Sequence, residues 1–150
     1  MASVVTEHVL LLVPMMLVVM IFPMVAGFVV INYNNQQRLL AVEQSSAKLG
    51  SAVQQAYLVA CNENVKDCTI MIANPLPPNL EDQQYIVTAS QEGESLTLHF
   101  GLPGLNIWYD HKIMLGQNAE WDSLSRLDSA SPTAGIQARK VAEKIYLSFR

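Results

Sequence analysis

An uninterrupted apolar run near the N-terminus constrains this chain more than any other feature. It opens at Val9 and ends at Ile31, and none of its 23 residues carries a formal charge. A helix needs about 20 such residues to cross a hydrocarbon layer of about 30 Å. A soluble core helix rarely contains such a run, because it would have to be buried on every side. The run therefore predicts a membrane-spanning helix.

The apolar run contains two prolines, Pro14 and Pro23, which are unfavourable inside a helix. In the interior of a water-exposed helix each would cost about 3 kcal/mol. Spanning helices tolerate proline where neighbouring helices or side chains satisfy the carbonyls that it frees. The prolines therefore favour a helix that packs against other helices. An isolated anchor that kinks slightly in lipid is the alternative.

The flanks of the run do not fit an ordinary secretory signal. Such a signal has a positively charged start, a shorter apolar core and a small-residue cleavage site. No Lys or Arg precedes Arg38, and nothing like A-x-A closes the run. The same lack of cations leaves the positive-inside rule without a prediction of orientation.

Glu7 lies immediately before the run, beside His8. At the level of the lipid headgroups both residues would be accommodated at little cost. Alternatively, Glu7 is drawn into the apolar layer of an assembly, where an ionised carboxylate needs a cationic partner. The N-terminal amine of a neighbouring chain would serve, and the residue chemistry leaves both interpretations open.

A second helical pattern follows the polar residues 32–35. Apolar residues recur there at intervals of three, four or seven: Leu39, Val42, Leu49, Val53, Ala56, Tyr57 and Ala60. This is the stripe of an amphipathic helix, in which only Gly50 lowers the helix propensity. We expect one continuous helix to about residue 60, with Tyr33 at the membrane interface. The predicted domains are this helix, 1–60, and a head, 61–150.

The sequence of the head shows the pattern typical of β-strands. Alternating β-branched and apolar segments predict strands at 69–72, 85–89, 95–100, 106–109, 112–115 and 145–149. A hairpin turn is expected at 91–94, and context favours a strand within 134–143 despite its helical propensity. The predicted fold class is α+β: a long N-terminal transmembrane helix continuing into an amphipathic helix, followed by a small antiparallel β-sandwich-like head.

Two cysteines, Cys61 and Cys68, flank a polar turn directly after the helix. This spacing suits a local disulfide if the compartment is oxidising, and free buried cysteines are the alternative. Two thiols without a nearby histidine make at most half a zinc site, so we expect no metal.

The sequence shows no catalytic constellation. It has no G-x-S-x-G elbow, no H-E-x-x-H and no glycine-rich phosphate loop. His99 should point outward from a strand, and Asp110-His111 should be a solvated strand end near a turn rather than an acid–base pair. A Ser-rich loop is expected from four residues: Ser123, Ser125, Ser129 and Ser131. We therefore expect neither an enzyme nor a cofactor.

Binding of other molecules has weak sequence support. The net charge is −4, so the chain lacks the excess of Lys and Arg that is typical of nucleic-acid-binding proteins. Trp108 and Trp121 could mark a binding patch, but tryptophans in a small sandwich more often fill the core or cover an edge.

These features together resemble the type IV pilin superfamily, and more closely its archaeal pilin-like and archaellin-like subunits. If the mature chain began at Ser3, Glu7 would be its fifth residue, where pilins carry their glutamate. Pro23 would then lie near the proline of the family's helix. The resemblance implies that Glu7 neutralises a neighbouring N-terminal amine during assembly. The family's basic leader has no counterpart in Met1-Ala2.

The expected function is therefore that of a structural subunit of a cell-surface filament. It would polymerise through its N-terminal helix, with Glu7, Pro14 and Pro23 as assembly residues. Its partners would be copies of itself, the membrane before assembly and the pilus assembly machinery. One alternative is a membrane-anchored accessory, such as a minor pseudopilin or a stator of a surface or secretion machine. Another is a membrane-tethered extracellular binding domain with its ligand near Trp108 or Trp121.

Overall fold

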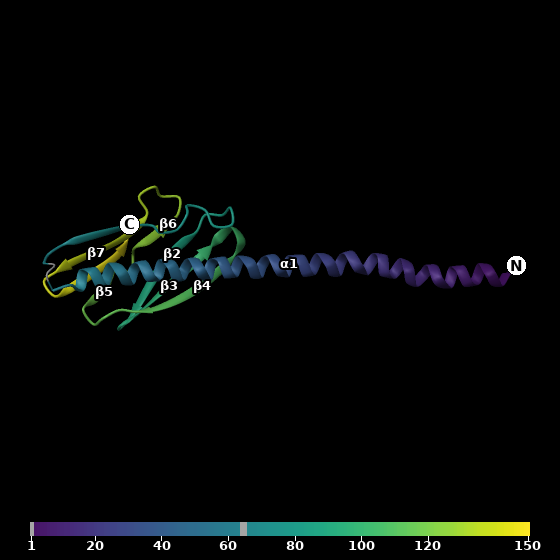
Figure 1. Cartoon of the computed structure of the whole chain (residues 1–150), viewed down its shortest axis with the longest axis horizontal. Coiled ribbons are helices and arrows are strands. Elements are labelled where there is room, and N and C mark those ends of the chain that lie inside the picture. Colours follow the sequence, from purple (N-terminus) through teal and green to yellow (C-terminus); the bar gives the residue numbers. More distant parts are fainter. Residues whose placement is uncertain (1, 64–65) are drawn as a thin grey trace. The chain divides into compact units, whose positions relative to one another are not determined.

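The computed structural model describes residues 2–63 and 66–150, with side chains described at residue 12 and from residue 14 onward within those ranges. The chain divides into two compact units, residues 1–38 and 39–150. One long helix comes first and is followed by eight strands and one short 3-10 turn in the described ranges (Figure 1). This order confirms the predicted α+β class.

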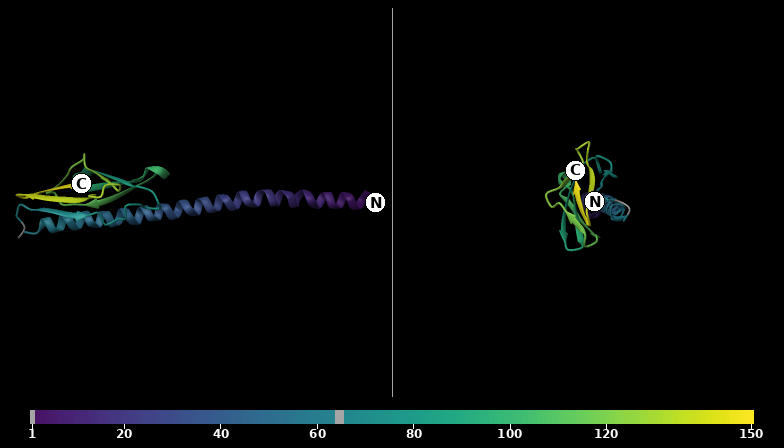
Figure 2. Two further views of the ribbon diagram at one scale, coloured as in Figure 1. Left: turned by 90° about the horizontal axis from the view of Figure 1, so that it is seen from above. Right: turned by 90° about the vertical axis from the view of Figure 1, so that its left-hand side faces the viewer.

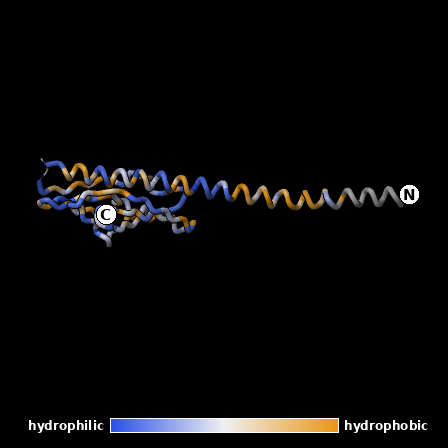
Figure 3. The backbone as a smooth tube through the Cα atoms, turned by 90° about the horizontal axis from the view of Figure 1, so that it is seen from below, coloured by the Kyte–Doolittle hydropathy of each residue, from blue (hydrophilic) through white to orange (hydrophobic). Residues whose placement is uncertain are grey.

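Helix α1 (Ala2–Cys61) is 60 residues long and contains both Pro14 and Pro23. The polar residues 32–35 do not interrupt it, as predicted. In Figure 3 the described part of its first half is mostly hydrophobic, and hydrophilic and hydrophobic residues alternate along its last turns. The two predicted patterns, apolar and then amphipathic, thus belong to one helix.

The strands form two sheets of four. The first contains β1 (Thr69–Ala73), β7 (Gly135–Val141), β8 (Lys144–Phe149) and β5 (Ala119–Trp121), in that order across the sheet. The second contains β4 (Ile107–Met114), β3 (Ser95–Leu102), β2 (Ile86–Glu92) and β6 (Arg126–Asp128). The turn η1 (Pro103–Leu105) joins β3 to β4. Among the described strands, β5 and β8 pair in parallel and every other pair is antiparallel.

Several strand predictions are confirmed and one is wrong. The hairpin at 91–94 joins β2 to β3, and residues 135–141 form β7. The two strands expected at 106–109 and 112–115 are instead the single strand β4. Asp110 and His111 continue the ladder because they pair with His99 and Leu98 of β3, so His111 is not near a turn. Strands β5 and β6 were not predicted, since three residues are too few to show a period.

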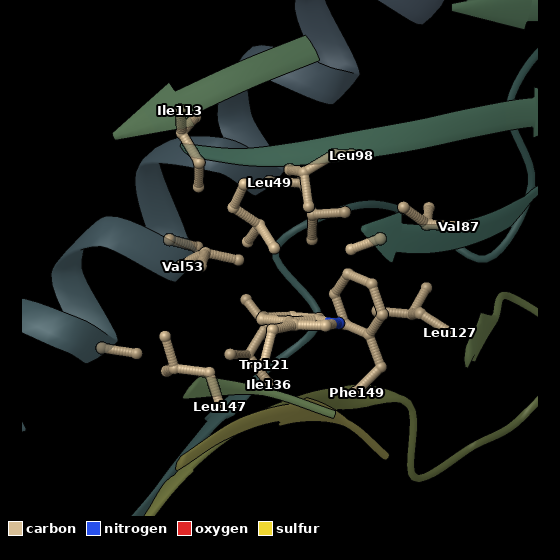
Figure 4. Packing of buried hydrophobic residues seen from close by; sticks show 14 of the residues in the cluster. Leu49, Val53, Val87, Leu98, Ile113, Trp121, Leu127, Ile136, Leu147 and Phe149 are labelled. Atoms are coloured by element: carbon tan, nitrogen blue, oxygen red, sulfur yellow. The ribbon is translucent and has the colours of Figure 1, made fainter. Parts of the chain in front are cut away.

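The second half of α1 supplies one wall of the head's core. Leu49 and Val53 are fully buried, and Figure 4 shows them pointing toward Leu98 of the second sheet and Leu147 of the first. The predicted apolar stripe is therefore the core face of this helical segment. Leu39 is the exception, with 45% of its surface exposed.

A glutamine side chain links the two sheets. Gln91 at the end of β2 donates from Nε2 to the carbonyl of Ala119 at 2.8 Å, and its Oε1 accepts from the backbone N–H of Trp121 at 2.6 Å. Because β2 and β5 belong to different sheets, these bonds fix one sheet against the other at this point.

The turned view in Figure 2 separates the strands of the head from the helical ribbon of residues 39–61.

Candidate functional site

The apolar surface of α1, here defined as the side chains of residues 14–31, is uncovered within the described structure. The most apolar 18-residue window of the helix has a mean hydropathy of 2.5 and none of it is buried. Met24 and Phe22 are 78% and 72% exposed. By length and composition this helix can cross a membrane, and a signal sequence near the N-terminus would meet the same criteria.

The prolines alter the backbone of that surface in two places. A proline has no N–H, so Pro23 leaves the carbonyl of Val19 without its helical donor, and Pro14 does the same to Leu10. Nine residues correspond to about two and a half turns, so the freed carbonyls lie on opposite sides of the helix. Each needs a donor from elsewhere when the surroundings are apolar.

Glu7 lies within α1, but its side chain is outside the described residues. Its role in assembly therefore stays a prediction.

The two cysteines lie at the other end of α1. Both thiols are free and half-buried in the structure, and their pairing as a disulfide stays a prediction. Tyr57, one turn before Cys61, donates a 2.7 Å hydrogen bond to Asn118 Oδ1. Burial, with a further contribution from the neighbouring Cys61 thiol, raises the pKa of Tyr57 to about 12.

The two tryptophans have different environments. Trp121 is only 9% exposed and packs edge-on against Phe149, with ring centroids 4.8 Å apart. It is a core residue that also borders a hollow on the first sheet. Trp108 is 55% exposed, and its ring lies directly over Gly101 on the neighbouring strand, where a Cβ atom would overlap it. Of the two, Trp108 presents the more exposed ring to a ligand.

Three side chains next to Trp108 form a hydrogen-bonded row, which we call the Ser90–His99–Asp110 cluster. His99 Nδ1 lies 2.8 Å from Asp110 Oδ1, and Ser90 Oγ lies 2.9 Å from His99 Nε2. The residues come from β2, β3 and β4, three neighbours in the second sheet. All point to the outer face, where the side chains of His99 and Asp110 are 36% and 64% exposed.

The chemistry of this row depends on which ring nitrogen carries the proton. An ionised carboxylate only accepts, so Asp110 selects the tautomer with the proton on Nδ1. Nε2 is then an acceptor, and Ser90 Oγ–H donates to it. A hydroxyl, an imidazole and a carboxylate in this order are the parts of an activated nucleophile: the group that attacks, its base and the group that orients the base.

The sequence drew attention to His99 and Asp110 separately, but it did not single out Ser90 or predict that the three side chains form a row. His99 does point outward, and Asp110 and His111 do not pair, because His111 faces Gly50 on the opposite side of the sheet. The missing signal was the register of β3 and β4, which places His99 directly opposite Asp110. Three short strands must be aligned to see it, and a local pattern cannot align them.

The hollows on the head carry a different set of side chains. One of about 610 Å³ lies on the first sheet beside Glu120, Arg139 and Tyr146. Another of about 670 Å³ lies beside Cys61 and Lys140. Among the described residues, no group of three or more His, Cys, Asp or Glu side chains could hold a metal ion.

Comparison of the chain with protein-family models, with curated proteins and with solved structures finds no match in any of the three.

Proposed function

We propose that this protein is the structural subunit of a cell-surface filament of the type IV pilus kind, which polymerises through the apolar surface of α1. The observation that carries the proposal is that surface itself: a long, uncharged helical face with no cover from its own chain in the described structure. A face of this kind must be covered by something else.

The free energy at stake is large. Burying one large apolar side chain stabilises by about 1.5–3 kcal/mol relative to leaving it in water. Residues 14–31 include more than ten large apolar side chains that are at least half exposed. Lipid would cover them before assembly, and the same helix from other copies would cover them in a filament core.

The prolines favour helix neighbours over lipid alone as the final surroundings. Lipid tails cannot donate hydrogen bonds to the carbonyls that Pro14 and Pro23 free, whereas polar atoms of a packed helix can. Gly27 also has no atom within 4 Å of where its Cβ would lie, so a neighbouring helix can approach closely there.

The head is consistent with a pilin-like subunit. Two four-stranded sheets and residues 39–61 contribute to one core, which supports a β-sandwich-like head attached to the end of the helix. The filament would then display this head on the cell surface.

Negative-stain microscopy of cells that produce the chain tests the proposal. We expect filaments with the unchanged protein and none with Glu7→Gln, because the amide cannot neutralise the amine of a neighbouring chain. Glu143→Gln is the matched control, since this exposed glutamate lies on the head, and it should leave the filaments intact. A protein that stays monomeric in membranes and detergent, without filaments, would show that the proposal is wrong.

The accessory alternative has the same anchor but a different abundance. A filament subunit should be among the abundant envelope proteins, whereas a minor pseudopilin or stator should be scarce. Quantitative mass spectrometry of the envelope separates the two. The mass of the mature chain reports leader cleavage, N-methylation and the disulfide state in the same measurement.

The tethered binding domain is favoured by one observation, the exposed ring of Trp108. Under that alternative the chain would stay single in the membrane and capture a ligand on the outer face of the second sheet. Trp108→Ala would then abolish capture, whereas a filament subunit would lose no filaments through that change.

A further inference from the structure

We propose that Ser90 is a nucleophile for acyl transfer, activated by His99 and oriented through Asp110, and that it reacts with small activated aryl esters. This activity lies on the head and is independent of the filament proposal.

The sheet holds the three side chains in place. Asp110 and His99 are directly opposite in the register of β4 and β3, and Ser90 lies on the same face of β2, diagonal to His99. Side chains directly opposite on neighbouring strands stand about 5 Å apart and diagonal ones about 7–8 Å apart, a distance that an imidazole ring can bridge. The row therefore needs no loop to close before it forms, because the strand ladders set its spacing.

The nearest cation to Asp110 is Lys112, two residues along β4 on the same outer face, and in the described structure the carboxylate pairs with His99 rather than with Lys112. Arg126, on the far side of β2, pairs with Asp128 at 3.4 Å. Lys144 pairs with Glu120 on the other sheet. The carboxylate of Asp110 is thus free to accept from Nδ1 and to stabilise the imidazolium that forms when His99 takes a proton.

The proposed reaction has two balanced steps. Ser90 Oγ attacks the carbonyl carbon of the ester while its proton passes to His99 Nε2, so an O–C bond forms and an O–H bond breaks. The ester's own C–O bond then breaks, and the aryloxide leaves and takes that proton from the His99 imidazolium. Ser90 is left O-acylated, and water, deprotonated by His99 in the same way, releases the carboxylic acid.

Trp108 points to the class of substrate. It lies two residues before Asp110 on the same face of β4, about 7 Å along the strand. Its exposed indole offers a flat apolar surface on which an aryl group can stack. The side chains of His99 and Asp110 are 36% and 64% exposed, so water reaches the cluster. Because an activated aryloxide is a better leaving group than the serine alkoxide, we expect acylation of Ser90 to be faster than hydrolysis of the acylated serine.

Mass mapping of the full chain in detergent micelles, after a short exposure to p-nitrophenyl acetate, tests the proposal. Ser95 is a control within the same molecule: it is on the same face of β3, but its hydroxyl donates to Met114 Sδ rather than to an imidazole. We expect acetylation of Ser90 to be at least about a hundredfold faster than acetylation of Ser95, the lower end of the range for a positioned general base.

Variants separate Ser90 from its neighbours. His99→Gln and Asp110→Asn should each slow acetylation of Ser90 by about a hundredfold or more. Ser90→Ala should abolish the initial burst of p-nitrophenol. Equal labelling of Ser90 and Ser95 in the unchanged protein would overturn the proposal, and that comparison does not depend on any variant folding. A full burst in Ser90→Ala would also overturn it, because a group other than Ser90 would then be the nucleophile that releases p-nitrophenol.

Discussion

The imidazole of His111 packs against Gly50 of α1 so closely that a Cβ at position 50 would lie 2.8 Å from His111 Cδ2. The glycine that lowers helix propensity in the amphipathic segment is therefore where the helix comes close to strand β4. Ile113 borders the same spot, with its Cγ2 3.1 Å from that Cβ position. The residue that weakens the helix locally thus lies where packing leaves no room for a side chain.

This contact predicts that Gly50 and His111 are energetically coupled. Gly50→Ala gains about 1 kcal/mol of helix propensity, but the added methyl overpacks the contact, which typically costs about 1–3 kcal/mol. We expect no net gain in stability, or a loss. In the His111→Ala background the same change should be more favourable by about 1 kcal/mol or more, within the range for contacting residues. Thermal unfolding of the four proteins of this cycle, in detergent, measures the coupling; additive effects would contradict it.

The two sides of α1 within the head should respond very differently to truncation. Leu49 is fully buried, so Leu49→Ala removes packed methyl groups and leaves a cavity, at a cost of about 2–5 kcal/mol. Leu58 lies on the same helix but is 64% exposed, and Leu58→Ala should change stability by no more than about 0.5 kcal/mol. Thermal midpoints of the two variants test this. Equal losses would show that Leu58 is covered in solution.

The phenol of Tyr57 predicts a loss of stability in alkali. Its pKa is raised from 10.0 to about 12, chiefly by burial, so the folded state holds a proton that the unfolded state has released. Between these two values unfolding is accompanied by loss of a proton, and stability falls as the pH rises through 10 and levels off near 12. Below pH 10 the group is protonated in both states and contributes no slope.

Thermal midpoints measured from pH 8 to 11.5 check this prediction. Tyr57→Phe should lower stability at neutral pH by about 1 kcal/mol, because the bond to Asn118 is lost, but should flatten the alkaline decline. Some decline should remain, because burial also raises the pKa of Tyr85. Tyr33→Phe, at a position 60% exposed on α1, is the matched control. An unchanged alkaline slope in Tyr57→Phe would contradict the assignment.

Features set by interactions between residues close in sequence could be predicted, whereas features set by long-range pairing could not. Helix α1 was predictable along its whole length because its signals, the charge-free run and the 3.6-residue stripe, are local. Strand β4 was split at Asp110 and His111 because two polar residues resemble a turn. Only their pairing with His99 and Leu98 of β3 shows that the ladder continues.

The candidate sites divide in the same way. The apolar surface of α1 is visible in composition alone. The Ser90–His99–Asp110 cluster depends on the register of three strands, which is set by the packing of the whole sheet. The different environments of Trp108 and Trp121 likewise depend on which face of each strand packs against the core. The amino-acid composition does not indicate which face that is.

Gly101 should control the position of the Trp108 ring, which we propose binds the aryl group of the ester. A methyl group at position 101 would overlap the indole ring, which must then lift toward solvent. We expect Gly101→Ala to increase quenching of tryptophan fluorescence by acrylamide, since buried Trp121 contributes little quenching in either protein. Gly27→Ala is the control, because nothing lies within 4 Å of its Cβ position. If the ring orients aryl esters beside Asp110, Gly101→Ala should also reduce the preference of Ser90 for aryl over alkyl esters of equal leaving ability. Unchanged quenching would show that the ring is not held on Gly101. Changed quenching with an unchanged preference would show that the ring lies there without guiding the ester.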